Sequence, residues 1–416
     1  MKEKQKIAIL CRRPKDFFLF QNLYKRLSDA EFVVVPPLAP EFTLKDYEQR
    51  ELKQYRLAAE FIARQNVRSR PGPFAVLQND STEMEGFFEP YALLIDTQNS
   101  FYLAHPANLN KKKILYLYED AITGFWPNIS FCNVDLVLTP GRYFNNLVAP
   151  LIPSEIVGNL YLDIPMKIPP PKLPAPFVPE KKTILYLPRE ELFNSPASFS
   201  GAVNELSLKY NVIVQLTQET SALGKNIKLF SLNKNITIID ETYDIRMLRD
   251  IVDLAVSDDA LTVLEWLALE KKALLLDLWT QDFISRNNGP ALENASAWNN
   301  NLNVAYDASG LKTFVGELLS KVQPSQRPLP EIGQFFDLEN KELACERAAK
   351  AIERAMAGPP AKPSAESALV FKPGNLTIKN YNFYYRTRPF ANSIDDIVRE
   401  ESFIKKCLKI IRVFFG

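Results

Sequence analysis

A short, mostly apolar run at residues 252–256 is typical of a strand buried in a parallel sheet. It is followed by three polar side chains, Asp258, Thr262 and Glu265. Thr262 and Glu265 are three residues apart, so they share one side of the helix expected after the strand. In open parallel sheets, ligands bind outside the carboxyl ends of the strands, and the following helix offers free N–H groups to phosphate. The spacing therefore predicts a nucleotide-binding or phosphate-binding site. The alternative is an ordinary capped helix with a solvated acid.

A basic turn follows the first expected strand, residues 7–10. It contains Arg12, Arg13 and Lys15, at the edge of the sheet where ligands bind in this class of fold. Cations at such an edge can hold an anionic acceptor or a leaving diphosphate. A solvated turn without a ligand is the alternative.

Composition narrows the chemistry. The single histidine, His105, would have to take part in any Ser-His-Asp catalysis or histidine metal cluster, so a general base is expected to be a carboxylate. The four cysteines show no paired spacing for zinc, so we expect reduced thiols and no metal site. The first strand and turn contain no glycine, so no dinucleotide cofactor is expected. A net charge of +1 provides no basic field for nucleic acid.

Strand-like and helix-like segments alternate through two halves of the chain, as in an α/β fold. Strands are expected at residues 7–10, 32–35, 92–95, 114–117, 136–138, 183–187, 212–215, 227–230, 237–239, 252–256, 273–276 and 303–305. Helices are expected at residues 17–27, 44–65, 198–209, 261–270 and 342–357. We therefore predict two Rossmann-like domains that face a cleft, residues 1–163 and 181–357. Seven prolines within residues 164–180 predict a stiff extended linker between them.

Residues 358–416 are expected to form a tail with a basic amphipathic helix. Within residues 403–415, Lys405, Lys406, Lys409 and Arg412 share one side of a helix whose other side is mostly apolar. Such a helix is too short to span a bilayer but can lie on an anionic membrane surface. Packing against the protein itself is the alternative. The first residues lack the apolar run of a signal peptide, so we expect a cytoplasmic protein, peripheral on the inner face of the membrane if this helix binds lipid.

Several stretches resemble GT-B transferases, nearest the CDP-glycerol glycerophosphotransferase group and the related UDP-sugar 2-epimerases. They are NVDLVLTPGRYFNNL at residues 133–147, VGNLYLD at 157–163, ILYLPR at 184–189, residues 243–277, and FFDLENKELACERAAKAI at 335–352. The resemblance implies GT-B architecture, with an acceptor domain at residues 1–163 and a donor-nucleotide domain at residues 181–357.

The resemblance also implies an activity. A GT-B transferase of this group moves a sugar or glycerophosphate unit from a nucleotide-activated donor to an envelope glycan or lipid-linked acceptor, without a further cofactor. Glu265 would accept the ribose hydroxyls of the donor, as a glutamate in that helix often does in this fold. Thr262 and Arg189 would hold its phosphates, although Arg189 can instead pair with its acidic neighbours.

One departure from the group concerns the catalytic base. The group usually has a His-Gly pair after a strand of the first domain, where this chain has Glu119 and Asp120. Either a carboxylate deprotonates the acceptor hydroxyl instead, or catalysis is lost. The two acids can also be the first residues of a helix. A non-catalytic GT-B-like subunit and a UDP-sugar 2-epimerase or hydrolase are therefore the alternative functions.

Overall fold

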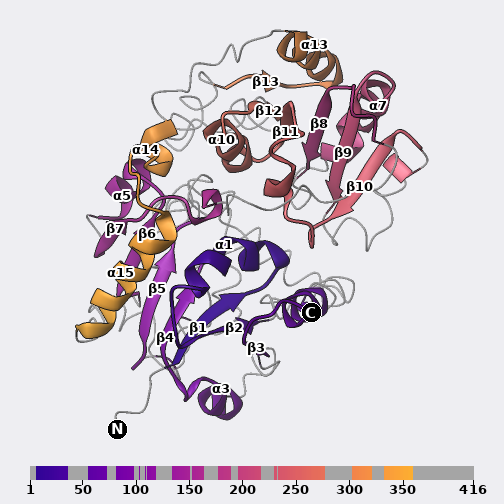
Figure 1. The fold of residues 1–416 in the computed structure, drawn as a ribbon. Helices are drawn as coiled ribbons and strands as arrows, with labels where there is room; N and C mark the ends of the chain where they lie inside the picture. The colour runs from indigo at the N-terminus through magenta and orange to yellow at the C-terminus, as the bar shows by residue number, and fades with distance from the viewer. Residues whose placement is uncertain are drawn as a thin grey trace, which may run out of the picture.

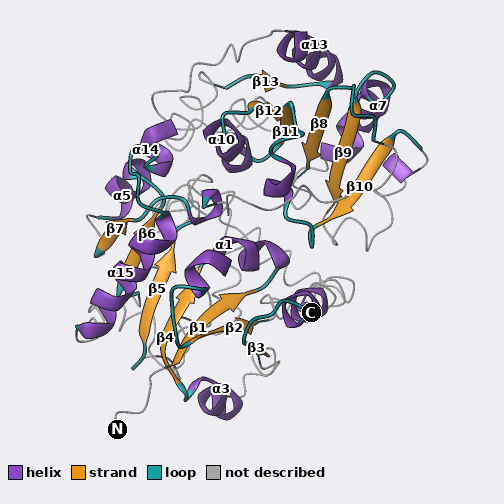
Figure 2. Ribbon diagram, viewed as in Figure 1, coloured by secondary structure: helices purple, strands orange, loops and turns teal. Residues whose placement is uncertain are grey.

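The structure is a computed structural model with two parallel sheets, each flanked by helices (Figure 1). It describes residues 6–35, 55–72, 81–97, 103, 108, 110–118, 134–149, 152–163, 177–188, 195–216, 229–231, 233–276, 302–320 and 332–358. Figure 2 shows the strands of each sheet side by side, with the second sheet above the first in this view. The predicted α/β fold of two Rossmann-like domains is confirmed.

The first sheet has the strand order β3-β2-β1-β4-β5-β6-β7, and every pairing is parallel. Its strands are β1 (Lys6–Cys11), β2 (Ala30–Val34), β3 (Ser69–Pro71), β4 (Tyr91–Asp96), β5 (Lys112–Tyr116), β6 (Leu136–Thr139) and β7 (Ser154–Ile156). The winding of the chain reverses between β1 and β4. A ligand crevice is therefore expected where these two strands end.

The second sheet has the strand order β10-β9-β8-β11-β12-β13, again with parallel pairing. Its strands are β8 (Thr183–Leu187), β9 (Asn211–Leu216), β10 (Ile236–Asp240), β11 (Leu254–Ser257), β12 (Lys272–Leu276) and β13 (Val304–Ala305). Here the winding reverses between β8 and β11. The segment with Asp258, Thr262 and Glu265 follows the carboxyl end of β11, as predicted, and the strand order makes this strand end part of a switch point.

The helices and short 3-10 turns connect these strands. They are α1 (Pro14–Tyr24), α3 (Ser81–Phe88), α5 (Arg142–Val148), η4 (Leu160–Leu162), α7 (Ser195–Leu206), η5 (Ile245–Leu248), α10 (Ala260–Ala268), α13 (Ala308–Ser320), α14 (Ile332–Phe336) and α15 (Ala344–Ala357). Helix α1 begins at Pro14, whose fixed φ suits the first helical position. The Asp16 carboxylate accepts the main-chain N–H groups of Arg12 and Arg13, which fixes the turn before the helix.

Alternate residues of each strand enter different cores, as the pleat requires. In β1, Ile7 and Ile9 belong to a cluster that also contains side chains of the second domain, whereas Ala8 and Leu10 face a separate cluster of the first domain. In the second sheet, residues of the same strands likewise divide between the shared cluster and a cluster against α7 and α13. Apolar packing therefore continues across the domain boundary.

The last two described helices return to the first domain, where α14 packs against α5, and α15 packs against α1 and η4 (Figure 1). Asp163 accepts the main-chain N–H groups of Ala344 (3.0 Å) and Cys345 (2.6 Å), at the start of α15. Near its other end, the Lys112 ammonium group donates to the carbonyl of Ala355. In sequence, α14 and α15 belong to the second half of the chain, but in space they pack on the first domain.

Most of the expected strands are confirmed within a residue or two, because buried parallel strands are nearly continuous apolar runs. The strand expected at residues 227–230 is wrong, since Leu229 and Phe230 are helical. The short strands β3 and β7 were not predicted, because three half-exposed residues carry almost no apolar pattern. The start of the helix expected at 44–65, most of the proline segment and the helix at 403–415 lie outside the described residues. No helix in the described part of the chain is long and apolar enough to cross a membrane.

Candidate functional site

A cavity of about 120 Å³ lies between the two domains, at the carboxyl ends of β8, β9, β10 and β11. The first domain contributes Arg13, Lys15, Phe18 and Tyr161 to its wall. The second domain contributes residues at or just after the carboxyl ends of these four strands, and the first turn of α10. The cavity thus occupies the switch point of the second sheet, where ligands bind in open α/β folds. Its volume is well below the roughly 300–1,000 Å³ of typical small-molecule sites.

The floor of the cavity is fixed by contacts between β8 and β11. The Ser257 hydroxyl, at the end of β11, donates to the carbonyl of Leu187 (2.7 Å), and it also accepts the main-chain N–H of Asp259 (3.1 Å). Ser257 is buried. These bonds hold the ends of the two strands together and set the direction in which α10 starts.

The amino terminus of α10 is capped by its own chain. The Asp259 carboxylate accepts the Thr262 main-chain N–H (3.3 Å) and the Thr262 hydroxyl (2.6 Å). The Thr262 hydroxyl and the helix-terminal N–H, which the sequence assigned to a donor phosphate, thus both donate to the Asp259 carboxylate in this structure. Phosphate binding at Thr262 stays a prediction, and it requires Asp259 to leave the helix terminus. Asp258, the preceding residue, is half-buried and does not line the cavity.

Glu265 lies one helical turn further along α10, yet its side chain is covered by the first domain. The hydroxyl of Tyr118 (2.7 Å) and the Nδ2 of Asn159 (3.0 Å) both donate to Glu265 Oε1. Glu265 is only 2% exposed. Burial raises its pKa to about 6; Lys15, Asn159 and Tyr118 oppose this rise, and Asp259 adds to it. In this structure Glu265 does not line an open crevice, so its role toward ribose hydroxyls stays a prediction.

Two cations of the first domain face the cavity. Arg13 and Lys15 lie at the start of α1 and form part of the wall opposite α10. The Lys15 ammonium group lies 5.2 Å from the centre of the Tyr118 ring, within range of a cation–π interaction. Of the basic turn, these are the two residues whose position suits an anionic ligand.

Arg12 has a different role in this structure. Its guanidinium forms two hydrogen bonds of 2.7 Å with the Asp96 carboxylate, and both side chains are buried. Since Arg12 follows β1 and Asp96 ends β4, this bidentate pair joins the two strands at the switch point of the first sheet. The predicted contact of Arg12 with an anionic acceptor would have to compete with Asp96.

Gln215 of β9 and Tyr243 of the loop after β10 also line the cavity, and the sequence did not point to either of them as a site residue. The Gln215 amide donates to the carbonyls of Asp240 and Tyr243, both at 3.1 Å, and so holds this loop against β9. The Tyr243 hydroxyl is buried and has no hydrogen-bond partner among the described residues, and burial raises its pKa to about 12. A buried hydroxyl without a partner beside a cavity is a candidate ligand contact.

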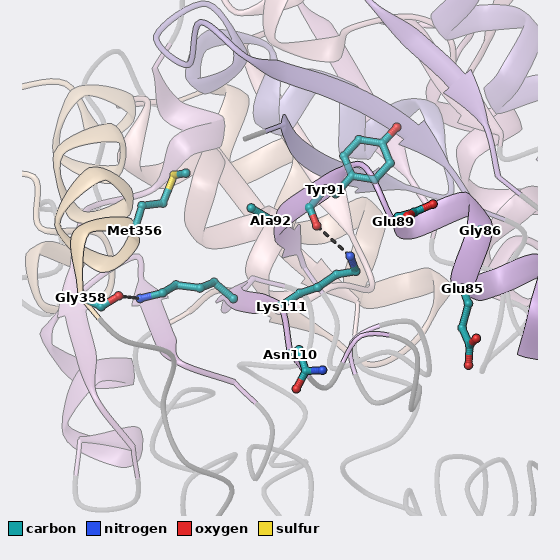
Figure 3. Close-up of a pocket in the computed structure, with 10 residues that line it drawn as sticks. Glu85, Gly86, Glu89, Tyr91, Ala92, Asn110, Lys111, Met356 and Gly358 are labelled. Carbon is teal, nitrogen blue, oxygen red and sulfur yellow. Dashed lines mark hydrogen bonds between the residues drawn. The ribbon is translucent and has the colours of Figure 1, made fainter. Parts of the chain in front are cut away.

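A larger hollow, of about 710 Å³, lies at the opposite, amino-terminal edge of the first sheet (Figure 3). Its two central cations already bind carbonyl oxygens. Lys111 donates to the carbonyl of Tyr91 (2.8 Å), and Lys112 donates to those of Ala355 and Gly358. Both lysines among the residues that line the hollow are thus bound to carbonyl oxygens, and the hollow lies at the edge of the sheet opposite the switch point. Its size alone therefore does not make it the site.

Three predicted site residues, Glu119, Asp120 and Arg189, lie outside the described residues. Tyr118, which directly precedes Glu119, is described and turns toward Glu265. Tyr118 and Asn159 were missed because they are 147 and 106 residues from Glu265 in the chain, and no local pattern connects them. Among the described residues, no group of three or more His, Cys, Asp or Glu side chains could hold a metal ion.

Comparison with known proteins gives the fold. No protein-family model and no curated protein sequence matches the chain. A Listeria monocytogenes structure assigned as a UDP-N-acetylglucosamine 2-epimerase is similar over 86% of this chain and 99% of its own, with a TM-score of 0.57 and 12% identity. The chain has the GT-B fold.

Two further structures share this GT-B fold. The wall teichoic acid polymerase TagF is similar over 85% of this chain and 89% of its own, with a TM-score of 0.54 and 11% identity. S. aureus MnaA with UDP is similar over 86% of this chain and 99% of its own, with a TM-score of 0.52 and 13% identity. The expected resemblance to the glycerophosphotransferase and epimerase groups is confirmed at the level of the GT-B fold.

Proposed function

We propose that the chain is a GT-B transferase that moves a sugar or glycerophosphate unit from a nucleotide-activated donor to an envelope glycan or lipid-linked acceptor. The observation that carries the proposal is the position of the interdomain cavity. It lies at the switch point of the second sheet, with Arg13 and Lys15 of the first domain facing the loops of the second. Cations opposite a helix terminus suit a diphosphate bound between two domains.

The similar structures support a nucleotide as the ligand. S. aureus MnaA has been solved with UDP, and a TagF variant has been solved after soaking with CDPG. In the present chain, the unpartnered Tyr243 hydroxyl at the cavity wall offers a further polar contact to such a ligand. Glu119 or Asp120 remains the proposed general base toward the acceptor hydroxyl.

The cavity is too small to hold a whole nucleotide-activated donor, so the proposed function requires the two domains to move apart. A space of about 120 Å³ holds only part of a nucleotide diphosphate. The domains must therefore separate to admit a donor, and Glu265 can reach ribose hydroxyls only when Tyr118 and Asn159 have withdrawn.

Ligand-induced stabilisation tests the proposal. UDP, CDP and their sugar or glycerol conjugates are added to the full chain, and a nucleotide at about 100 times its dissociation constant should raise stability by roughly 2.7 kcal/mol. Lys15→Ala should weaken binding of the diphosphate about tenfold, because a charge-assisted contact is lost. Lys25→Ala is the matched control, since Lys25 is an exposed lysine just after the other end of α1. If no nucleotide stabilises the protein, the transferase proposal fails.

A non-catalytic GT-B-like subunit is the second candidate, and one observation favours it. The Glu265 carboxylate, which the donor would need, is already satisfied by the first domain. If this closed arrangement is permanent, the chain keeps the fold as a scaffold for a partner. The absence of nucleotide binding together with a fixed domain arrangement would support this candidate.

A further inference from the structure

The hydrogen bonds of Glu265 join side chains of the two domains. Glu265 belongs to α10 of the second domain, whereas its carboxylate partners, Tyr118 and Asn159, follow β5 and β7 of the first domain. All three side chains are at most 3% exposed. A buried carboxylate is destabilising unless it is hydrogen-bonded. If the domains separate, water or a ligand must replace Tyr118 and Asn159 as the hydrogen-bond donors to Glu265.

The two donors resemble what a ligand would offer at the same place. A hydroxyl and an amide N–H converge on one carboxylate oxygen, much as the hydroxyls of a sugar ring would. The neighbouring cavity, with Lys15 and Arg13 in its wall, is too small for such a ligand while the contact persists. The contact and a bound donor are therefore mutually exclusive at Glu265.

We propose that Tyr118 and Asn159 form an interdomain latch that covers Glu265 and holds the cleft closed until a ligand hydroxyl replaces them. The ligand part of this proposal rests on the proposed function, whereas the closing of the domains does not. The latch acts beside a second interdomain contact, in which the buried Arg246 of η5 donates to the carbonyls of Tyr161 (2.8 Å) and Phe18 (3.1 Å). The Arg246 guanidinium also lies 4.4 Å from the centre of the Tyr161 ring, so this contact combines two carbonyl acceptors with one aromatic side chain. The latch differs in that it depends on hydrogen bonds between three specific side chains.

Asn159→Asp is the sharpest test. The Asn159 Oδ1 accepts the main-chain N–H of Tyr161 (2.9 Å) at the start of η4, and an aspartate keeps this cap. The substitution removes the Nδ2 donor and places a second carboxyl group against Glu265. At a pH above the pKa of both groups the two carboxylates repel each other, so the test is made in alkaline buffer. Tyr118→Phe removes the other donor with almost no change of shape. Both variants should open the cleft without disturbing the first domain.

Tyr91→Phe is the matched control. Tyr91 is also buried and its hydroxyl also donates to a glutamate, Glu31 (2.8 Å), but both residues belong to the first domain and lie away from Asn159 in the chain. Loss of this hydroxyl should cost stability without opening the cleft. Circular dichroism establishes that each variant is folded, and Glu265→Ala, which removes the acceptor of both donors, is the alternative latch variant if either of them does not fold.

Small-angle X-ray scattering of the full chain measures the domain separation, and hydrogen exchange of α10 provides a local readout. The latch predicts a larger radius of gyration and faster exchange in Asn159→Asp and Tyr118→Phe, but not in Tyr91→Phe. Unchanged scattering and exchange in both folded latch variants would overturn the latch.

Titration with UDP and CDP then tests the ligand separately. The latch variants should bind one of them about tenfold more tightly than the native chain, because the cost of opening has been removed. Open domains without nucleotide binding would keep the latch and reject the proposed transferase. Equal binding by native and variant chains with unchanged scattering would keep the nucleotide site and reject the latch.

Discussion

The pH dependence of stability should reveal the cost of burying Glu265. Its pKa rises from 4.5 to about 6 on folding, chiefly because burial disfavours the charged form. The folded state therefore binds the proton more tightly than the unfolded state, so stability falls as pH rises from about 4.5 to 6. At 1.36 kcal/mol per pKa unit, a rise to about 6 corresponds to a loss of about 2 kcal/mol at neutral pH.

Glu265→Gln isolates this contribution. The amide cannot ionise, but it keeps an oxygen acceptor for Tyr118 and Asn159. Both chains contain the other ionisable groups that interact electrostatically with Glu265. These groups are Lys15, Asp259, Tyr116, Tyr118 and Tyr161. The difference between the two chains therefore reports the carboxyl group alone.

Urea unfolding of both chains between pH 4 and 7.5 is the assay. The free energy of unfolding of the glutamine variant should rise relative to that of the native chain by about 2 kcal/mol across this range. A difference that does not change with pH would refute the reasoning, since Glu265 would then have the same pKa folded and unfolded. A difference of opposite sign would mean that Lys15 and the two donors outweigh burial.

Three other perturbations follow from the contacts described. Arg246→Met should lower the free energy of unfolding by about 3–5 kcal/mol, because Asp244 loses its buried partner and two carbonyls lose their donor. Urea unfolding measures this change, and a loss below about 1 kcal/mol would contradict the expectation. Tyr243→Phe should leave the free energy of unfolding unchanged or raise it by up to about 1 kcal/mol, and it should weaken nucleotide binding measured by calorimetry. A clear loss of stability would show that the hydroxyl has a hydrogen-bond partner. Asp163→Ala should cost about 1–2 kcal/mol in thermal unfolding through loss of the α15 cap, and no change would show that water replaces it.

Much of the fold could be read from the sequence because its signals are local. Buried parallel strands such as β8 and β11 are short apolar runs, and the polar residues after β11 mark the end of a strand at a switch point. The resemblance of scattered segments to GT-B transferases pointed to the fold that the structures share. Short half-exposed strands such as β7 lack this apolar signal, so they were not predicted.

The residue types at the strand ends are visible in the sequence alone, namely the cations of the turn after β1 and the acids and hydroxyl of the β11–α10 segment. The partners of these side chains become visible only in the folded chain. Arg12 pairs with Asp96, Thr262 with Asp259, and Glu265 with two donors more than a hundred residues away. The physical reason is that a strand end is fixed by local apolar pattern, whereas the partner of a buried charge depends on which distant segment the closed domains bring against it.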